Sequence, residues 1–516
     1  MEKVRILWVD DEIELLKPHI IFLQSKGYEV STANNGEDAL ECLDNKTFEI
    51  IFLDENMPGI SGLETLERIY EIHNIPVVMI TKSEEEYIME EALGSKISDY
   101  LIKPVNPNQI LLSLKKNLDS KRLVNHKVTN SYQKEFRQIS QYIMEARSLN
   151  NWFSIYHQLV HWELELDQID SSGMVEILEM QKAEANAQFF KYVKNNYESW
   201  LNEGDEKPVL SHTLIREKLV PFLSNNRSDF FILIDNLRYD QWKILQPIVE
   251  EWFSIENESS FCSILPTATQ YSRNSIFSGL SPLAISKRFP HLWKNDNEEG
   301  GKNLHEKEFL EDQMQRLGLS EKKVSYNKVV KQQFGARLVD QFSHLLQNDL
   351  NVIVYNFVDM LSHAKTEMEM IRELAGNDKS YRALTRTWFE NSSLLDMLKK
   401  IAESGSQLFI TTDHGTINVS VPSRVIGDKE TSSNLRYKTG KRLQYQKKDV
   451  MVMEDPEQFF LPAANLSSKF IFAKENIYLT YPNNYNHFVK YFRDTYQHGG
   501  ISLEEMVCPF IRLSPK

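Results

Sequence analysis

Cysteine is scarce in this 516-residue chain, which contains three, Cys42, Cys262 and Cys508. They are far apart and none belongs to a CxxC pair, which argues against a disulfide framework and against a thiolate zinc site. Long apolar runs are also missing, since no stretch approaches the roughly 18 apolar residues that a membrane span requires. The chain enters a strand-like run at once, without a secretory leader. We therefore expect a cytoplasmic protein that has no membrane contact.

Positive charge is in deficit as well. The chain has 59 basic and 73 acidic residues, for a net charge of −14. The sequence also lacks a helix-turn-helix candidate with a basic recognition helix. Both observations argue against direct promoter binding, and the length predicts about three domains.

Strand-like runs occur in two separate parts of the chain. Up to about residue 120, VRILWV, FEIIFL, PVVMI and DYLI alternate with amphipathic stretches, which is typical of βαβ units around a parallel sheet. Such runs then disappear, and three helical stretches predict a small helical bundle. After Pro208 the runs DFFILI, NVIVYNF and QLFIT predict a second parallel α/β domain. The predicted domains are 1–120, 121–208 and 209–516.

Polar side chains follow the four strands of the first domain. Asp10 and Asp11 end the first strand, Asp54 the second, Thr81 the third and Lys103 the fourth. Because parallel strands end at one edge of a sheet, these side chains should converge there. Three carboxylates together require a cation, and hard oxygen ligands favour Mg²⁺. Asp54 can then accept a phosphoryl group, with Lys103 neutralising its charge and Thr81 donating a hydrogen bond to it.

The run Asp-Glu-Asn-Met-Pro-Gly that begins at Asp54, together with the other strand-end residues, resembles the response-regulator receiver family. The resemblance implies a flavodoxin-like (βα)5 fold and phosphorylation of Asp54 by a sensor histidine kinase. It also implies that the Asn56 carbonyl completes the Mg²⁺ site, that the peptide bond between Lys103 and Pro104 is cis, and that Tyr100 reorients on phosphorylation.

The second α/β domain repeats this arrangement with metal-ligand residue types. Asp235 ends the run DFFILI, and Asp359 follows NVIVYNF four residues before His363, so that a helix would place both side chains on one face. The remaining candidates are Asp413 and His414 after QLFIT, and His498 before Gly499-Gly500. Three Asp and three His are enough ligands for two zinc ions with open positions, an arrangement suited to displacement at phosphorus.

A threonine pair supplies the candidate nucleophile. Thr267 and Thr269 lie in the segment LPTATQYSRN before an apolar helical stretch, and a helix N-terminus favours both an anionic phosphate and an alkoxide. The ordered set Asp…PTxT…DxxxH…DHG…HGG resembles the alkaline phosphatase superfamily, and its PglZ branch in particular. The context of Cys262 does not match the sulfatase pattern C/S-x-P-x-R.

The alkaline phosphatase resemblance implies a grouping of the ligands. Thr269 takes the nucleophile position, with Thr267 as the alternative. One zinc ion would be held by Asp235, Asp413, His414 and the Thr269 hydroxyl, and the other by Asp359, His363 and His498.

Four further residues are candidate substrate contacts. Arg273 and Asn274 follow the threonines, although a helix-face role explains them equally well. Arg436 and Lys438 belong to the basic stretch RYKTGKRLQYQKK, which could bind a phosphate backbone and stack on bases, or be a solvated loop. A polyanionic substrate, a nucleotide or an oligonucleotide, is the interpretation we favour.

The three-part arrangement resembles response regulators associated with the type IX secretion system. This resemblance implies homodimerisation on phosphorylation, a zinc-dependent phosphodiesterase for linear or cyclic oligonucleotides, and partnership with an extracytoplasmic-function sigma factor. The alternative is an adaptor without catalysis, in which zinc is structural and the effector binds a sigma factor or another protein. The sequence leaves open the physiological substrate, the direction of regulation and the dimer geometry.

Overall fold

The computed structural model describes most of the chain. It covers residues 4–73, 75–82, 97–105, 107–169, 172–202, 207–224, 226–428, 431–463, 465 and 467–516. The chain divides into two compact units, Met1–Tyr132 and Gln133–Lys516. In the described part of the chain, every helix is too short or too polar to cross a bilayer.

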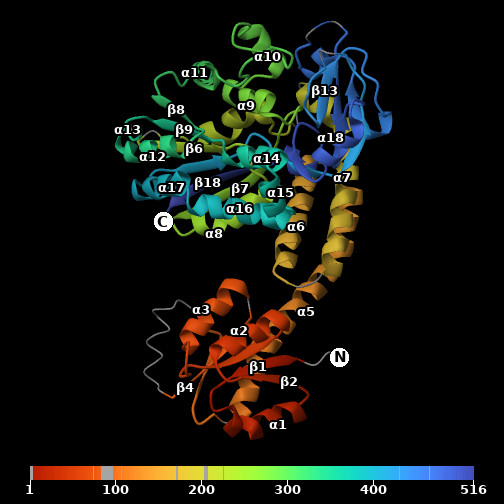
Figure 1. Ribbon diagram of the computed structural model, residues 1–516. Helices are drawn as coiled ribbons and strands as arrows, with labels where there is room; N and C mark the ends of the chain where they lie inside the picture. Colours follow the sequence, from red (N-terminus) through yellow and green to blue (C-terminus); the bar gives the residue numbers. More distant parts are fainter. Residues whose placement is uncertain are drawn as a thin grey trace. The chain divides into compact units, whose positions relative to one another are not determined.

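The N-terminal unit is built on a five-stranded parallel sheet with the strand order β2-β1-β3-β4-β5 (Figure 1). This order is that of flavodoxin-like folds, as predicted. Strands β3 and β4 are buried along their whole length, because helices cover both faces of a parallel sheet. The strands are β1 (Arg5–Val9), β2 (Glu29–Ala33), β3 (Ile50–Asp54), β4 (Val77–Thr81) and β5 (Asp99–Ile102), and the helices are α1 (Lys17–Ser25), α2 (Gly36–Asn45) and α3 (Gly62–Ile72).

Three long helices follow: α5 (Pro107–Glu145), α6 (Leu149–Asp167) and α7 (Ser172–Leu201). Aromatic side chains pack α6 on α7, with the Trp152 ring 5.5 Å from that of Phe189. The two helices also bind the C-terminal α/β fold directly. On α7, the Tyr197 hydroxyl accepts a hydrogen bond from the Leu265 amide, and Asn186 donates to the Glu504 carboxylate. On α6, His157 Nε2 lies 2.9 Å from Ser260 Oγ. Helices α6 and α7 are therefore part of the scaffold of that fold.

The C-terminal fold contains a six-stranded sheet with the order β7-β18-β10-β6-β9-β8, and helices lie on both of its faces (Figure 1). The prediction of a parallel sheet holds for β10, β6, β9 and β8, but it is wrong for β18 and β7, which are antiparallel. Strand β7 is half-exposed, as is typical of an antiparallel edge. The strands are β6 (Asp229–Ile234), β7 (Phe253–Cys262), β8 (Val324–Val329), β9 (Leu350–Tyr355), β10 (Leu408–Thr411) and β18 (Val507–Pro515).

Smaller elements complete this unit. The chain segment between β10 and β18 forms three small sheets, β11-β17, β12-β16 and β13-β15-β14. Their strands are β11 (Ile417–Val419), β12 (Val421–Arg424), β13 (Tyr437–Gly440), β14 (Val450–Met453), β15 (Lys469–Ala473), β16 (Ile477–Thr480) and β17 (Thr495–Gln497). The helices are α8 (Tyr239–Val249), α9 (Thr269–Ser278), α10 (Pro282–Arg288), α11 (Glu306–Arg316), α12 (Gln332–Asp340), α13 (Phe342–Leu345), α14 (Phe357–Glu367), α15 (Glu369–Leu374), α16 (Asp378–Glu390), α17 (Ser393–Glu403), α18 (Tyr485–Phe492) and α19 (Leu503–Met506).

Candidate metal centres

The carboxyl edge of the N-terminal sheet gathers three carboxylates. One oxygen from each of Asp10, Asp11 and Asp54 lies within 4.8 Å of the others. The Lys103 ammonium is 2.9 Å from Asp10 and 2.9 Å from Asp54. Burial raises the pKa of Asp54, and Lys103 lowers it in part. A set of three oxygen donors with one fixed cation fits Mg²⁺ well.

The other residues predicted for this edge lie around it. Thr81 is buried at the end of β4, Tyr100 is half-buried in β5, and Asn56 is exposed just after β3. The predicted cis peptide bond between Lys103 and Pro104 is confirmed.

A first cluster in the C-terminal unit combines Asp235, Asp413 and His414. All three are fully buried, and one ligand atom from each lies within 4.8 Å of the others. The His414 Nδ1 is 3.0 Å from the Gly415 carbonyl oxygen, which fixes the ring and leaves Nε2 for the cluster. The Asp413 Oδ2 accepts no hydrogen bond from the residues that the structure describes. A buried carboxylate oxygen without a donor fits a bound cation.

A second cluster combines Asp359, His363 and His498, whose ligand atoms also lie within 4.8 Å of one another. Asp359 and His363 are one turn apart on α14, as predicted from their spacing. The His498 ring stacks on the His414 ring with 4.3 Å between centroids, so the two clusters are adjacent. The His363 side chain is exposed, which leaves the second cluster open to solvent.

Electrostatics favour cations in both clusters. Burial, and then repulsion from Asp235, raises the pKa of Asp359 and of Asp413 to about 6. Burial, and then the His414 imidazole, lowers the pKa of His498 well below its usual value. Crowded carboxylates beside a neutral imidazole are the donor set of a divalent metal site.

The two candidate threonines have different environments. Thr269 is the first residue of α9, and its Oγ1 lies 3.2 Å from His414 Nε2 and 3.5 Å from Asp235 Oδ1. The Thr267 hydroxyl is fully buried, donates to the Gly500 carbonyl and accepts from the Gly499 amide, both at 3.0 Å. Thr267 therefore supports the loop that carries His498, whereas Thr269 faces the first cluster.

Arg273 was predicted to contact substrate, but it is fully buried. Its guanidinium group lies 2.7 Å from Asp235 and 2.7 Å from Glu306. Arg273 thus forms an ion pair with Asp235, a residue of the first cluster. The sequence carried no signal that Glu306 would be the second partner.

The other three predicted substrate contacts are also buried, and each is bonded to other groups of the protein. Asn274 donates to the Lys302 carbonyl at 2.9 Å, and Arg436 lies 2.7 Å from Glu505. Lys438 donates to two backbone carbonyls, at 3.1 Å each. The exposed cations of the basic stretch are Arg442, Lys447 and Lys448.

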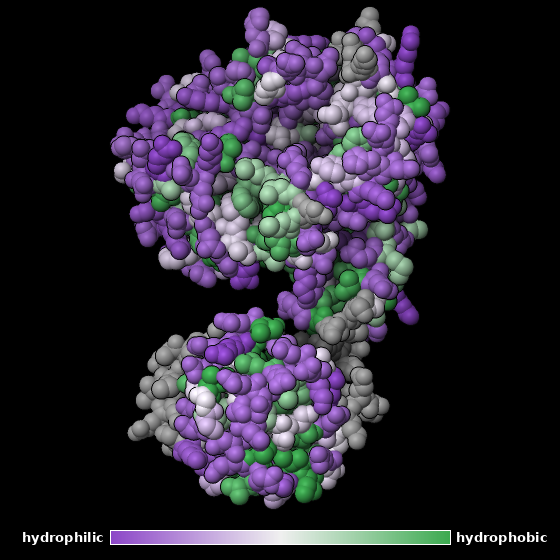
Figure 2. Space-filling view, in the orientation of Figure 1, coloured by the Kyte–Doolittle hydropathy of each residue, from purple (hydrophilic) through white to green (hydrophobic). Residues whose placement is uncertain are grey.

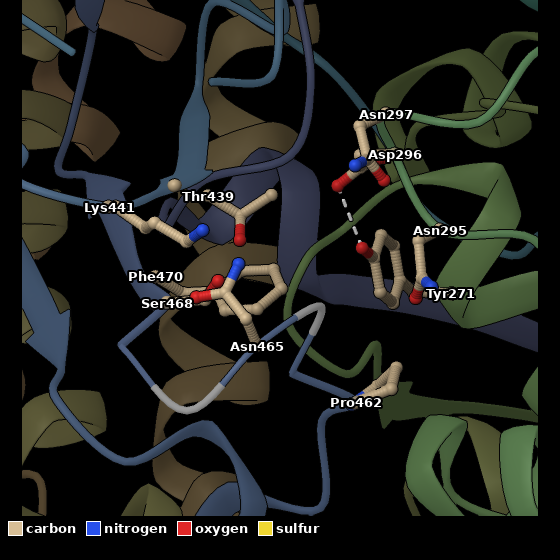
Figure 3. Close-up of a pocket in the computed structure, with 11 residues that line it drawn as sticks. Tyr271, Asn295, Asp296, Asn297, Thr439, Lys441, Pro462, Asn465, Ser468 and Phe470 are labelled. Atoms are coloured by element: carbon tan, nitrogen blue, oxygen red, sulfur yellow. Dashed lines mark hydrogen bonds between the residues drawn. The ribbon is translucent and has the colours of Figure 1, made fainter. Parts of the chain in front are cut away.

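A polar pocket lies beside α9 and β13 (Figure 3). The Tyr271 hydroxyl points to Asp296 and donates to it at 2.8 Å. The Tyr437 hydroxyl donates to the other oxygen of the same carboxylate at 2.9 Å. Asp296 therefore ties α9 to the sheet β13-β15-β14, a contact that sequence spacing could not have suggested.

The surface next to the second cluster is apolar. Met360 is exposed on α14, and Met368, Met370 and Leu374 are exposed on and beside α15. Figure 2 shows hydrophobic side chains gathered on the face that α14 and α15 cover. The helix that carries Asp359 and His363 is therefore bordered by exposed apolar side chains.

Three family models match the chain. The BREX system PglZ alkaline phosphatase-like domain matches residues 214–513, the PorX response regulator linker domain residues 122–201, and the response regulator receiver domain residues 6–115.

Similar proteins match the N-terminal part. A transcriptional regulatory protein CpxR homolog of Haemophilus influenzae is 37% identical over 113 residues, 22% of this chain and 48% of that protein. The transcriptional regulatory protein ZraR of Klebsiella oxytoca is 35% identical over 151 residues, 29% of this chain and 34% of that protein. The solved chemotaxis protein CheY4 of Vibrio cholerae is 32% identical, with a TM-score of 0.21, and the match covers 22% of this chain and 99% of that one. The chain spans about half or less of the length of these curated relatives.

Proposed function

Because the chain belongs to the family of PglZ alkaline phosphatase-like domains, we propose that it is a metal-dependent phosphodiesterase controlled by phosphorylation of Asp54. The observation that carries this proposal is the position of the Thr269 hydroxyl. It lies 3.2 Å from His414 and 3.5 Å from Asp235, at the N-terminus of a helix and beside two adjacent ligand clusters.

The residues have distinct roles in this proposal. Two zinc ions, when bound, would lower the pKa of the threonine hydroxyl and neutralise the transferred phosphoryl oxygens. The Thr269 hydroxyl gives its proton to water and its oxygen attacks phosphorus, while the bond to the leaving alkoxide breaks and the alkoxide takes up a proton from water. A further water molecule then hydrolyses the threonyl phosphodiester, which releases the phosphate monoester and restores the hydroxyl. The free N–H groups at the start of α9 bind the phosphoryl oxygens. The ligands would be Asp235, Asp413, His414 and Thr269 for one ion, and Asp359, His363 and His498 for the other.

Receiver domains pair with sensor histidine kinases, and the N-terminal unit carries the residues for that exchange. Mg²⁺ would be held by the three carboxylates and the Asn56 carbonyl, while Lys103 and Thr81 bind the phosphoryl group and Tyr100 responds to it. The linker match supports assignment to the PorX response regulators. We therefore propose a cytoplasmic homodimer on phosphorylation, which regulates type IX secretion with an extracytoplasmic-function sigma factor as partner.

The proposed substrates are nucleotides and linear or cyclic oligonucleotides. Support comes from the exposed apolar side chains beside the second cluster, which suit the flat faces of bases. The exposed cations Arg442, Lys447 and Lys448 suit a phosphate backbone.

The test compares the purified wild type with Thr269→Ala on bis-p-nitrophenyl phosphate, with bound zinc measured in the same samples. We expect close to two zinc ions in both proteins and hydrolysis by the wild type alone. If both bind two zinc ions and hydrolyse the diester equally slowly, the phosphodiesterase proposal fails and the adaptor alternative gains.

A further inference from the structure

Asn236 touches the carboxylates of both clusters. It directly follows Asp235, is fully buried, and has a left-handed backbone with φ 64°. Its main-chain amide donates to Asp413 Oδ1 at 3.3 Å. Its side-chain Nδ2 donates to Asp359 Oδ1 at 3.4 Å and to Ser362 Oγ at 3.1 Å. One residue after a ligand of the first cluster thus holds a ligand of the second.

Asn356 makes the reciprocal contact. It lies between β9 and α14, three residues before Asp359, and its Nδ2 donates to Asp235 Oδ2 at 2.9 Å. Arg273 lies 2.7 Å from the same oxygen. Because Oδ2 of Asp235 is engaged in this way, Oδ1 is the oxygen that faces Thr269 and His414.

Local backbone preferences account for neither side chain. Asparagine tolerates the left-handed region, but glycine would satisfy the backbone of Asn236 as well and would carry no amide. Asn356 is the N-cap residue of α14, yet its side chain makes no capping hydrogen bond. Both amides are instead directed across the gap between the clusters, where each donor lies against a carboxylate.

We propose that Asn236 and Asn356 are positioning residues that couple the two clusters, so that a metal ion in one favours a metal ion in the other. A cation that fixes Asp235 also fixes Asn356, which precedes the Asp359 helix. A cation that fixes Asp359 also fixes Asn236, which adjoins Asp235 and Asp413. Occupation of either cluster thus lowers the cost of ordering the other, and such coupling is reciprocal. The inference rests on the proposed two-metal function.

The experiment is a calorimetric titration of metal-free, full-length protein with zinc, combined with elemental analysis of the bound metal. Asn236→Gly keeps the left-handed backbone and removes the amide, and Asn356→Ala removes the reciprocal one. We expect the wild type to bind its second zinc ion more tightly than the first. In each variant we expect the second zinc ion to bind at least tenfold more weakly than in the wild type, with the first changed less than twofold.

A matched control lies on β9, the strand that precedes Asn356. Asn351, at the other end of β9, is an equally buried amide that donates to Ser228 and to the Leu345 carbonyl. Asn351→Ala should lower the thermal unfolding midpoint of the metal-free protein yet keep the stepwise zinc affinities in the wild-type order. If Asn351→Ala weakens the second zinc ion as much as Asn236→Gly does, general destabilisation explains the effect and the inference is overturned.

Two further outcomes separate the inference from the function beneath it. If both asparagine variants bind two zinc ions with wild-type stepwise affinities, the coupling is wrong and the phosphodiesterase proposal stands. If the wild type itself binds fewer than two zinc ions, the two-metal function fails and the coupling fails with it. Because Asn356 is only partly buried, Asn356→Ala keeps the test available should Asn236→Gly not fold.

Discussion

Thr269 Oγ1 lies 3.2 Å from Nε2 of His414, at the first residue of α9. This contact predicts that two substitutions of Thr269 have different effects on turnover. Thr269→Ser keeps a hydroxyl beside the first cluster and should retain measurable turnover. Thr269→Ala should lose turnover by about a thousandfold, equivalent to about 4 kcal/mol of transition-state stabilisation. Steady-state hydrolysis of a p-nitrophenyl diester at saturating zinc measures both.

Thr267→Val is the companion variant. The substitution removes the hydroxyl that is hydrogen-bonded to Gly499 and Gly500, next to His498. We expect it to reduce zinc content and to lose activity in proportion to the missing metal. A zinc-replete Thr267→Val protein with no turnover would instead identify Thr267 as the nucleophile.

Asp54→Ala should abolish the response to phosphorylation without changing zinc binding. The substitution removes the phosphoryl acceptor but leaves the C-terminal ligands untouched, so zinc content should stay at the wild-type value. Treatment with acetyl phosphate and Mg²⁺ should change the oligomeric state or the diesterase rate of the wild type only. Light scattering and the diester assay measure these changes, and Asp44→Ala, at an exposed carboxylate on α2, is the control. Loss of zinc from Asp54→Ala would contradict independent sites.

Strand-end residues were predictable because their positions follow from the fold itself. Once parallel strands are recognised, every residue after a strand lies at one edge of the sheet. Asp10 could therefore be grouped with Asp54, and Asp235 with Asp413, from the sequence alone. The i,i+4 spacing of Asp359 and His363 was sufficient for the same reason. His157 and His161 share that spacing on α6, but the His157 ring packs against Tyr239.

What the sequence could not supply was the partner of each buried cation. Arg273 follows Thr269 by four residues, and Arg436 belongs to a basic stretch, which made both of them candidates for substrate binding. Their partners, Glu306 and Glu505, come from distant segments, and only the fold brings them together. The same holds for Asn236 and Asn356, because the exchange between them depends on two strands lying side by side. Burial depends on the tertiary structure, and it decides whether an arginine is accessible to substrate or pairs with a carboxylate inside the protein.

Arg273 should be more important for stability than for substrate binding. Burial lowers its pKa, but Asp235 and Glu306 raise it overall, so the guanidinium group stays charged. Arg273→Met leaves Asp235 without a cation and leaves Glu306 with Lys328 alone, at 3.0 Å, which costs about 3–5 kcal/mol of unfolding free energy. Denaturant unfolding of the metal-free protein measures this cost. Zinc should restore part of the loss, because a bound cation replaces the missing charge beside Asp235.

Two further variants test whether the ion pairs of Arg273 account for its contribution to stability. Arg288→Ala removes an exposed arginine that pairs with Asp312 and should leave the midpoint nearly unchanged. Arg273→Lys keeps a cation between Asp235 and Glu306 and should lose less stability than Arg273→Met. An Arg273→Lys protein as unstable as Arg273→Met would contradict the pairing.

His157 should make the attachment of α6 sensitive to acid. Its ring stacks on Tyr239 with 4.0 Å between centroids, its Nε2 is 2.9 Å from Ser260 Oγ, and burial lowers its pKa to about 4. In the unfolded chain the imidazole titrates near its ordinary value of about 6.5. Between these values the unfolded state binds a proton that the folded state does not. The free energy of unfolding therefore falls as pH drops from about 6.5 towards 4, by at most about 3 kcal/mol.

His157→Gln can keep a hydrogen bond to Ser260 and removes the titration. Denaturant unfolding of chelator-treated protein should therefore show a smaller loss of stability than the wild type between pH 6.5 and 4.5. Working without metal avoids the acid-dependent loss of zinc, and the titrating carboxylates of the two clusters are common to both proteins, so they cancel in the comparison. His161→Gln, at an exposed position one turn along α6, should follow the wild type. Parallel pH profiles for His157→Gln and the wild type would show that the buried imidazole is not the source of the acid sensitivity.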